Sequence, residues 1–430
     1  MMTAVFDVPG LGPVAPSSSS PASFDVPSRV RVLLLGGGVS SLMTAWMLLD
    51  KGYMVTIVSR DWASQTRPIT SQVAGALWEY PPGGCGIAEL GSSASGYSGL
   101  DQYREWALQS FEFYEAMAAL DEAKGDKEGR FGVKMKKLVQ FFGAPLELGA
   151  DDDRHREKYC AIRRMDEDVD SPFYGRLGMR DVSGEELTRV DPTGVFGVTC
   201  AYEHVAPVID TDAVMRFLME LVQRKGAVLK TREIEGDIRL QEQMLLSEYR
   251  ADVIVNATGI GARQLANDSQ MFPVRGAVRR IKRPPGYPAD KAFLLPAQTA
   301  SDGSVGKTVF IVPRNDETVV VGSIVQRDNW KLNLSLDSSE VRDMWERATE
   351  FLPILKEAEP ADRPLVQGLR PFSHLNVRVA VDGPGSRIVH NYGHGGSGWT
   401  LAVGCARTCV RLVDEILHRD RLATVDMCRL

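Results

Sequence analysis

Near its start the chain carries hydrophobic positions whose spacing changes twice within a short stretch. Arg31–Leu35 is a compact apolar run of the kind that forms a buried strand. Apolar residues then recur at helical spacing from Leu42 to Leu49, and Gly52 is a typical residue just beyond a helix C-terminus. A second apolar run covers residues 54–58. The pattern predicts strand, helix and strand in succession, as in the β-α-β unit of a dinucleotide-binding fold.

The turn between the first strand and the helix opens with three consecutive glycines. Gly36 suits a tight turn, Gly38 lets the backbone approach a pyrophosphate, and Ser41 is small enough for helix–strand packing. Asp61 follows the second strand about where a ribose-binding carboxylate is expected, and Arg60 stands beside it. The glycine motif alone is a weak signal, but its strand–helix–strand context indicates dinucleotide binding.

The same region must be weighed against a membrane span, because residues 32–49 contain no charged side chain. That length is near the minimum for a transmembrane helix. The glycines and serines interrupt the stretch, however, and its periodicity changes midway. We find no second candidate span in the sequence and no apolar N-terminal signal segment. The pattern therefore favours a protein that does not cross a membrane.

Further pieces of the same fold are predicted in the middle of the chain. Residues 212–225 have apolar positions at helical spacing and end before Gly226, and residues 228–234 follow as a strand. Residues 251–255 form a strongly apolar strand that ends in a small-residue turn through Gly259. A strand with such a turn is how a flavin domain closes over its cofactor, although an ordinary loop between strand and helix has the same pattern.

A second glycine-rich segment, HNYGHGGSGWT, occupies residues 390–400. Residues 401–418 follow with one apolar face at helical spacing. A glycine-rich loop that opens a helix offers free N–H groups and the positive end of the helix dipole. The alternative is a glycine turn that merely feeds a core helix. With the earlier segments, this one predicts a dinucleotide-binding domain built from separated pieces of chain.

Composition fits a globular protein of two or three domains, with 430 residues and 44% hydrophobic content. The net charge of −6 argues against a general nucleic-acid or anionic-membrane surface. The six cysteines include no CxxC pair, and the six histidines show no metal spacing with them. Cys405 and Cys409 could face one metal ion from a helix, but their place on the apolar stripe favours core packing. No metal site is predicted.

Two segments are predicted to lie outside the packed domains. Residues 1–28 are rich in Pro, Ser and Gly, which is typical of a disordered arm. Residues 121–170 are rich in charged side chains, and we interpret them as a solvated excursion on a domain surface.

Four motifs together resemble the D-amino-acid oxidase family, and the resemblance spans most of the chain. They are SQVAGALW at 71–78, ADVIVNATG at 251–259, GLRP at 368–371 and HNYGHGGSGWT at 390–400. The resemblance implies a non-covalently held FAD and oxidation of a D-amino acid at its Cα–N bond. It also implies an α/β fold, with a Rossmann-type FAD-binding domain built from discontinuous segments and a mixed-sheet α+β substrate domain.

The resemblance also implies domain boundaries. We expect the FAD-binding domain at 29–85, 196–264 and 370–425, and the substrate domain at 86–195 and 265–369. The tail at 426–430 ends in Cys428-Arg429-Leu430, a relaxed form of the peroxisomal Ser-Lys-Leu signal. A peroxisomal location is therefore predicted, with the cytoplasm as the alternative.

Roles for individual residues follow from the same resemblance. Arg370 would hold the substrate carboxylate, and the carbonyl of Gly396 would accept a hydrogen bond from the substrate amine. A guanidinium suits a carboxylate because its planar fork makes two parallel hydrogen bonds. The residues expected to bind FAD are Gly36, Gly38, Val39, Ser41, Arg60, Asp61, Thr70, Ser71, Ala76, Leu77, Ile234, Gly259, Gly395, Gly396, Ser397, Gly398, Trp399 and Thr400.

The sequence departs from the family at the predicted substrate pocket. Phe310 occupies the place of a family tyrosine that bonds the carboxylate, and Gly306 aligns with a second tyrosine. His374 stands where the family commonly has another arginine. The pocket should therefore keep its arginine, lose its hydroxyl donors and become wider and more apolar at that wall. A bulky or apolar D-amino acid should fit it better than a small polar one.

These observations predict an FAD-dependent oxidase that converts such a D-amino acid to an imine and then a 2-oxo acid, while oxygen becomes hydrogen peroxide. Three alternatives stay open: an oxidase of an amine-bearing natural-product intermediate, a dehydrogenase with another electron acceptor, and a non-catalytic flavoprotein. The expected partners are the small amine substrate and molecular oxygen, with no nucleic acid or membrane and a possible homo-oligomer.

Overall fold

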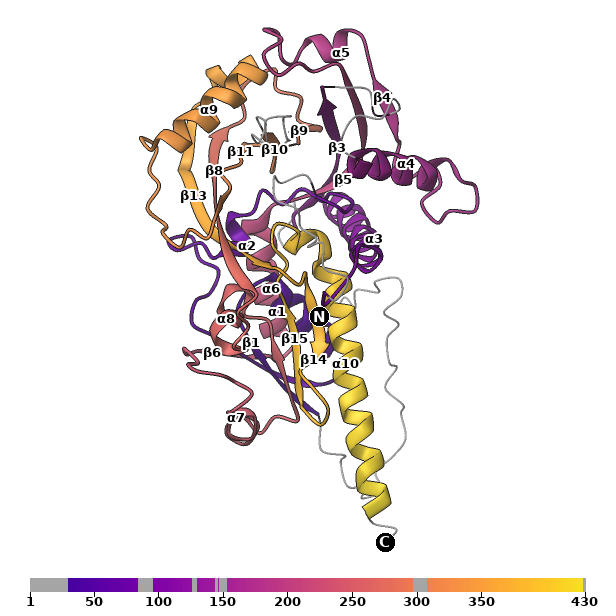
Figure 1. Cartoon of the computed structure of the whole chain (residues 1–430), viewed down its shortest axis with the longest axis vertical. Helices are drawn as coiled ribbons and strands as arrows, with labels where there is room; N and C mark the ends of the chain where they lie inside the picture. Colours follow the sequence, from indigo (N-terminus) through magenta and orange to yellow (C-terminus); the bar gives the residue numbers. More distant parts are fainter. Residues whose placement is uncertain are drawn as a thin grey trace.

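The computed structural model describes residues 30–83, 96–125, 130–143, 146, 153–296 and 308–427. The predicted arm at 1–28, the tripeptide at 428–430 and Gly306 lie outside these residues, so the expectations for them stay predictions. Within the described residues the chain forms two β-sheets with helices packed around them. Figure 1 shows the nine-stranded sheet in its upper part and the six-stranded sheet in its lower part.

The six-stranded sheet has the order β14-β15-β7-β1-β2-β6. Its strands pair in parallel except for β14, which is antiparallel to β15. Parallel sheets of this kind are covered on both faces, which explains why their strands are apolar along most of their length. This is the predicted Rossmann-type architecture built from separated segments. The strands are β1 (Arg31–Leu35), β2 (Met54–Ser59), β6 (Val228–Thr231), β7 (Val253–Asn256), β14 (Arg378–Val381) and β15 (Ile388–Tyr392).

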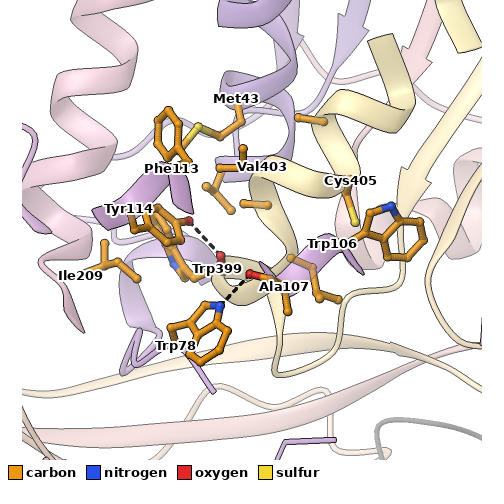
Figure 2. Packing of buried hydrophobic residues seen from close by; sticks show 14 of the residues in the cluster. Met43, Trp78, Trp106, Ala107, Phe113, Tyr114, Ile209, Trp399, Val403 and Cys405 are labelled. Carbon is orange, nitrogen blue, oxygen red and sulfur yellow. Dashed lines mark hydrogen bonds between the residues drawn. The ribbon is translucent and has the colours of Figure 1, made fainter. Parts of the chain in front are cut away.

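Helices α1 (Val39–Asp50), α3 (Leu100–Lys124), α6 (Thr211–Arg224) and α10 (Gly398–Met427) pack together, and α1 and α10 contact strands of this sheet. The close approach of α10 to α3 depends on Gly404, where a Cβ would overlap the Trp106 backbone. Figure 2 shows the core between them, with the Tyr114 hydroxyl donating to the Trp399 carbonyl at 2.8 Å. The Trp78 indole donates to the Ala107 carbonyl at 2.9 Å in the same core. The start of α10 is therefore tied to α3.

The nine-stranded sheet has the order β12-β8-β11-β10-β9-β3-β5-β4, with β13 also paired to β8. It is mixed, because β3 is parallel to β9 and antiparallel to β5. Helix α9 (Ser339–Phe351) contacts its strands β8, β10 and β11. The strands are β3 (Val133–Phe142), β4 (Arg180–Val182), β5 (Cys200–Ile209), β8 (Met271–Lys282), β9 (Lys291–Leu295), β10 (Val309–Pro313), β11 (Thr318–Gly322), β12 (Gln326–Arg327) and β13 (Pro360–Ser373).

The shorter elements complete the described chain. They are the helices α2 (Thr70–Val73), α4 (Asp153–Glu167), α5 (Glu185–Thr188), α7 (Glu242–Tyr249) and α8 (Ala262–Leu265), and the 3-10 turns η2 (Gly259–Gly261) and η3 (Pro353–Glu357).

For the described residues of 121–170, the interpretation as a solvated excursion is wrong. Strand β3 runs through the interior of the nine-stranded sheet, between β5 and β9. Asp121 is buried, and its carboxylate accepts the backbone N–H groups of Phe131 and Gly132, each at 2.6 Å. Lys136 is 6% exposed and donates to the Ala289 carbonyl at 2.6 Å. The charged residues hide the strand pattern in the sequence. A long side chain such as that of Lys136 can pack its stem inward while its charged end finds a partner at the edge of the core.

The sheets also divide the chain differently from the predicted domain boundaries. Strand β5 lies within the range 196–264, which was expected in the FAD-binding domain, yet it pairs with β3 in the nine-stranded sheet. Strand β13 belongs to that sheet as far as Ser373, beyond the predicted boundary at residue 370. The local sequence of an apolar strand does not show which strand it pairs with, so it cannot assign the strand to one sheet or the other.

Candidate active site

Segments from both sheets enclose a cavity of about 1730 Å³. Ligand sites commonly measure roughly 300–1,000 Å³, so this one has room for a dinucleotide and a substrate together. Every predicted site residue lines it except Ser41, which is fully buried inside α1. The predicted residues on the wall are Gly36, Gly38, Val39, Arg60, Asp61, Thr70, Ser71, Ala76, Leu77, Ile234, Gly259, Phe310, Arg370, Gly395, Gly396, Ser397, Gly398, Trp399 and Thr400.

The turn after β1 forms one end of the cavity. Gly36 has φ +111°, and a Cβ there would overlap the Ala257 carbonyl at the end of β7. Gly38 is the N-cap of α1 and brings no capping side chain to the first N–H groups of the helix. The N–H of Val39 donates to the Ser71 hydroxyl at 3.1 Å. The positive end of α1 therefore faces the cavity with its backbone accessible, which is a suitable place for a pyrophosphate.

Arg60 and Asp61 lie at the outer side of this end and are joined by an ion pair of 2.8 Å. Arg60 also pairs with Glu233 at 3.0 Å, and Ile234 follows on the cavity wall. The hydrogen bond to Asp61, and then that to Glu233, raises the pKa of Arg60. Both partners are largely exposed, so this pair adds little to stability. It places a carboxylate beside the turn, in the position expected for a ribose contact.

Helix α2 and the residues after it form a further part of the cavity wall. The carbonyl of Ser71 accepts the Trp399 indole N–H at 2.9 Å, which joins α2 to the start of α10. Thr70 donates to the Leu369 carbonyl at 3.4 Å. Ala76 has φ +50°, an uncommon conformation for a residue with a Cβ. The chain therefore makes a sharp, well-anchored bend where SQVAGALW meets the cavity.

The HNYGHGGSGWT segment forms a tight turn at the start of α10. Gly395 has φ +53°, and its N–H donates to the Pro371 carbonyl at 2.9 Å. The N–H of Ser397 donates to the His394 carbonyl at 2.9 Å. His394 is 6% exposed, and burial lowers its pKa to about 4, so its imidazole is neutral at ordinary pH. The turn thus presents Gly396 and the positive end of α10 to the cavity.

Arg370 lies on β13 at the other end of the cavity. It donates to the Ile324 carbonyl at 3.0 Å and to the Ser323 hydroxyl at 2.8 Å. Gly276 on β8 leaves the space that the guanidinium fills, because a Cβ there would overlap it. With five N–H donors, a guanidinium can keep such contacts and still bind a carboxylate. The strands therefore hold one cation in a fixed orientation at the cavity wall.

Phe310 lies on β10 near the same end, partly buried and on the cavity wall. Its ring packs against Gly75, where a Cβ would overlap it. The part of the cavity lined by Gly75, Leu77, Phe310, Ser323 and Arg370 is called the substrate end below. It combines one cation with an apolar wall.

Sequence reasoning missed several residues that shape the substrate end. Gly75 lies inside the SQVAGALW motif and could have been singled out as a glycine in a site motif. Gly276, Ser323 and His394 also line the cavity. Nothing in the local sequence around Gly276 or Ser323 indicates that they meet Arg370, since that contact depends on how β8, β12 and β13 pair.

Residues 31–412 match the protein family described as FAD dependent oxidoreductase. The match covers most of the chain, so the chain belongs to this family of FAD-dependent oxidoreductases. The predicted cofactor and the resemblance to the D-amino-acid oxidase family are thereby confirmed.

Individual relatives agree with this membership. A D-amino-acid oxidase of Rubrobacter xylanophilus is 29% identical over 393 residues, which are 90% of this chain and 97% of that protein. A human D-aspartate oxidase is 28% identical over 404 residues, or 91% of this chain and 96% of that protein. Glycine oxidase from Bacillus cereus has a similar fold, with a TM-score of 0.65 at 17% identity, covering 90% of this chain and 95% of that one.

The residues around the cavity fit FAD. The start of α1, where Gly38 brings no capping side chain, and the glycines before it suit the pyrophosphate, and Asp61 suits a ribose. The turn at Gly395 and the start of α10 line the cavity and would offer backbone groups to the flavin. In the described part of the chain no group of three His, Cys, Asp or Glu side chains could hold a metal ion. Among the same residues, no helix is long and apolar enough to cross a membrane.

Proposed function

We propose that the protein oxidises a D-amino acid with a large side chain at its Cα–N bond, giving an imine while oxygen is reduced to hydrogen peroxide. The observation that carries the proposal is the fixed guanidinium of Arg370 at the substrate end of a cavity that fits FAD. The relatives named above as D-amino-acid and D-aspartate oxidases support it.

Arg370 would bind the substrate carboxylate through two parallel hydrogen bonds. The carbonyl of Gly396 would accept a hydrogen bond from the substrate amine. Two such contacts, one on each substituent of Cα, fix which face of Cα is presented to the cofactor. Holding the reacting atoms in one geometry is a large part of the catalytic effect that a protein can supply. The stereochemical preference would follow from the relative positions of Arg370 and Gly396.

Bound FAD would supply the acceptor for the hydride that leaves Cα. The protein need provide no strong acid or base for this step, since the lone pair of the neutral amine drives it. His394 is consistent with this, because a pKa lowered to about 4 makes its imidazole only a weak base. The start of α10 would stabilise negative charge that develops nearby. Water would then hydrolyse the released imine to a 2-oxo acid and ammonia.

Phe310 supports a preference for large side chains. By resemblance to the family, its ring takes the place of a hydroxyl that would reach the carboxylate, so the carboxylate would depend on Arg370 and on Ser323 beside it. An apolar wall next to Cα favours substrates that bury carbon against it. A substrate as small as D-alanine would leave that wall uncovered. We therefore expect D-alanine to be a poor substrate.

The test is anaerobic mixing of the FAD-loaded protein with matched D- and L-enantiomers of a large amino acid such as methionine. Loss of the visible flavin absorbance with the D-form alone is the expected result. Admission of oxygen should then restore the absorbance and release hydrogen peroxide. Bleaching by the L-form alone, or by no amino acid, would refute the proposal. Bleaching that oxygen fails to reverse would identify a dehydrogenase that uses another acceptor.

A further inference from the structure

Glu79 brings a carboxylate to the cavity that the proposed reaction does not use. The chain around it runs alongside β5, where Leu77 bridges to Val208 and the Trp78 N–H donates to the Pro207 carbonyl at 2.9 Å. Side chains alternate in such an extended segment. Trp78 accordingly points into the core, while Leu77 and Glu79 both line the cavity. Glu79 therefore extends the wall of the substrate end beyond Leu77.

Lys158 on α4 neutralises this carboxylate. It is 1% exposed, and its ammonium donates to Glu79 and, at 3.2 Å, to the Pro82 carbonyl. Burying an ammonium this deeply is unfavourable unless it is paired and hydrogen-bonded. A carboxylate accepts several hydrogen bonds at once, so pairing with Lys158 is compatible with a further contact to a ligand. The pair as a whole is neutral and offers acceptor oxygens at the wall.

The neighbouring strands carry buried polar side chains that have atoms without hydrogen-bond partners among the described residues. Gln140 on β3 stands opposite Tyr202 on β5, and His204 lies two residues further along the same face. All three are buried, and among the described residues no hydrogen-bond partner exists for either amide atom of Gln140, the Tyr202 hydroxyl or the His204 Nε2. The charges of both Glu79 and Lys158 act on the titration of His204. These three side chains are buried near the ion pair and do not line the cavity.

These buried polar side chains belong to the same face of the sheet as Phe310. Phe310 pairs with Leu294, Leu294 with Gln140, and Gln140 with Tyr202, so the four side chains form one row across β10, β9, β3 and β5. Adjacent strands lie about 4.8 Å apart, which separates the two ends of the row by roughly 14 Å. Along this row the buried face changes from apolar at Phe310 to polar at Tyr202. Glu79, whose charge acts on the titration of Tyr202 and His204, lines the cavity beside this polar region.

We propose that the Glu79–Lys158 pair is a specificity-determining site for the substrate side chain. The preferred D-amino acids would carry a neutral hydrogen-bond donor, an amide or a hydroxyl, beyond an apolar stem that packs on Leu77 and Phe310. An acidic side chain would meet the Glu79 carboxylate, and a cationic one would meet Lys158. A site built to hydrogen-bond a substrate group rejects the analogue that lacks it more strongly than an apolar pocket does. This inference rests on the proposed function.

The test compares D-glutamine, D-glutamate and D-methionine, which have side chains of similar length ending in an amide, a carboxylate and a thioether. In the wild-type protein we expect kcat/KM for D-glutamine to exceed that for each of the other two at least tenfold. In Glu79→Gln the advantage of D-glutamine over D-glutamate should shrink at least tenfold, while kcat/KM for D-methionine stays within threefold. Equal efficiency on all three, or a ratio that Glu79→Gln leaves unchanged, would overturn the inference.

A double variant protects the test against misfolding, since Glu79→Gln leaves Lys158 buried with a weakened partner. Replacing both members by apolar residues of similar size, Glu79→Leu with Lys158→Met, is often neutral or stabilising for a buried ion pair. It should oxidise D-methionine as well as or better than wild type and lose the preference for D-glutamine. If that preference survives, the pair is not the selective group.

A matched control variant completes the design, and the outcomes distinguish failure of the proposed function from failure of this inference. Lys134→Met breaks an exposed ion pair with Asp316 on the same sheet and should change no ratio. If the wild type oxidises none of the three substrates, both the proposed function and this inference are refuted. If it oxidises all three with equal efficiency, the proposed function stands and only the inference fails.

Discussion

The two sheets contribute different chemistry to the same cavity. On the side of the six-stranded sheet the wall is made largely of backbone, with the glycine turn at Gly36, the start of α1 and the turn at Gly395. On the side of the nine-stranded sheet it is made of side chains, with Arg370 and Phe310 at its centre. Backbone groups recognise a ligand that does not vary, whereas side chains can be exchanged without altering the fold. Changes on the first side should therefore alter cofactor retention, and changes on the second should alter substrate choice.

The largest expected effect is the loss of FAD in Gly36→Ala. The new Cβ would overlap the Ala257 carbonyl, and φ of +111° is unfavourable for alanine. We expect the purified variant to lack the yellow colour of bound flavin. Gly52→Ala is the matched control, because Gly52 has φ +81° at the other end of α1 but a Cβ added there would meet no atom within 4 Å. Retention of flavin by Gly36→Ala would show that the turn does not shape the cofactor site.

The next largest effect is expected from Arg370→Ala. Removing one partner of a desolvated charge pair should weaken substrate binding by about 2–5 kcal/mol, which is roughly 30-fold to a few thousandfold. Apparent dissociation constants from anaerobic flavin reduction measure this directly. An amine that has the same side chain but no carboxylate serves as the control, and its constant should not change. A loss below about threefold for the amino acid would place the carboxylate elsewhere.

A smaller effect that depends on the substrate is predicted for Phe310→Tyr. If the hydroxyl reaches the carboxylate, turnover of D-alanine should improve by a factor consistent with one charge-assisted hydrogen bond, about 1.5–3 kcal/mol. Large substrates that pack on the ring would instead bury an unpaired hydroxyl and be oxidised less efficiently. We expect the opposite signs for D-alanine and D-methionine. High wild-type turnover of D-alanine that the substitution leaves unchanged would contradict a wall adapted to large side chains.

The smallest effect concerns the dependence of stability on pH. Each of the two regions contains one buried histidine that can report it. His204 on β5 and His394 before α10 are both buried, and desolvation lowers each pKa to about 4. In the unfolded chain both titrate near pH 6.5. Between these values the unfolded state binds more protons, so stability is complete above about pH 6.5 and falls as the pH drops toward 4, by about 1 kcal/mol per histidine at pH 5.5.

His204→Asn should therefore show a smaller drop in thermal midpoint between neutral pH and pH 5.5 than wild type. The exposed His418 supplies the control, since His418→Asn should leave the drop unchanged. Equal drops in all three proteins would mean that buried imidazoles do not set the acid sensitivity. Carboxylates whose pKa values are lowered, such as Asp382 beside His390, lose their contribution to folding stability in a lower pH range.

The sequence was most informative where the structure depends on neighbours along the chain. The β1-α1-β2 unit was predictable because its strands, helix and turn are contiguous and each has its own period. The same holds for the glycine turns, whose conformations are local. Strand β3 was missed because its three lysines resemble a solvated surface, although Lys136 is buried and donates to the Ala289 carbonyl. The assignment of β5 to one sheet required knowledge of its partner, which no local pattern supplies.

The site residues also divide into those that the sequence predicted and those that it did not. The residues that line the cofactor side were predictable from motifs, apart from Ser41, which is buried in α1 and does not reach the cavity. On the substrate side, Arg370 was predicted, but the glycine that accommodates it on β8 was not. The pairing of Glu79 with Lys158 joins residues 79 positions apart through α4, a helix that the charged segment did not reveal. Such a contact joins segments that are far apart in the sequence, so no local pattern reveals it.

The most direct test of this division of labour is the FAD dissociation constant of Arg370→Ala, measured by titration of the apoprotein with flavin fluorescence. The account predicts a constant within twofold of wild type, in the same preparation that has lost affinity for the D-amino acid. If the substitution weakened FAD and substrate binding together, the two walls of the cavity would not act separately, and the account would be contradicted.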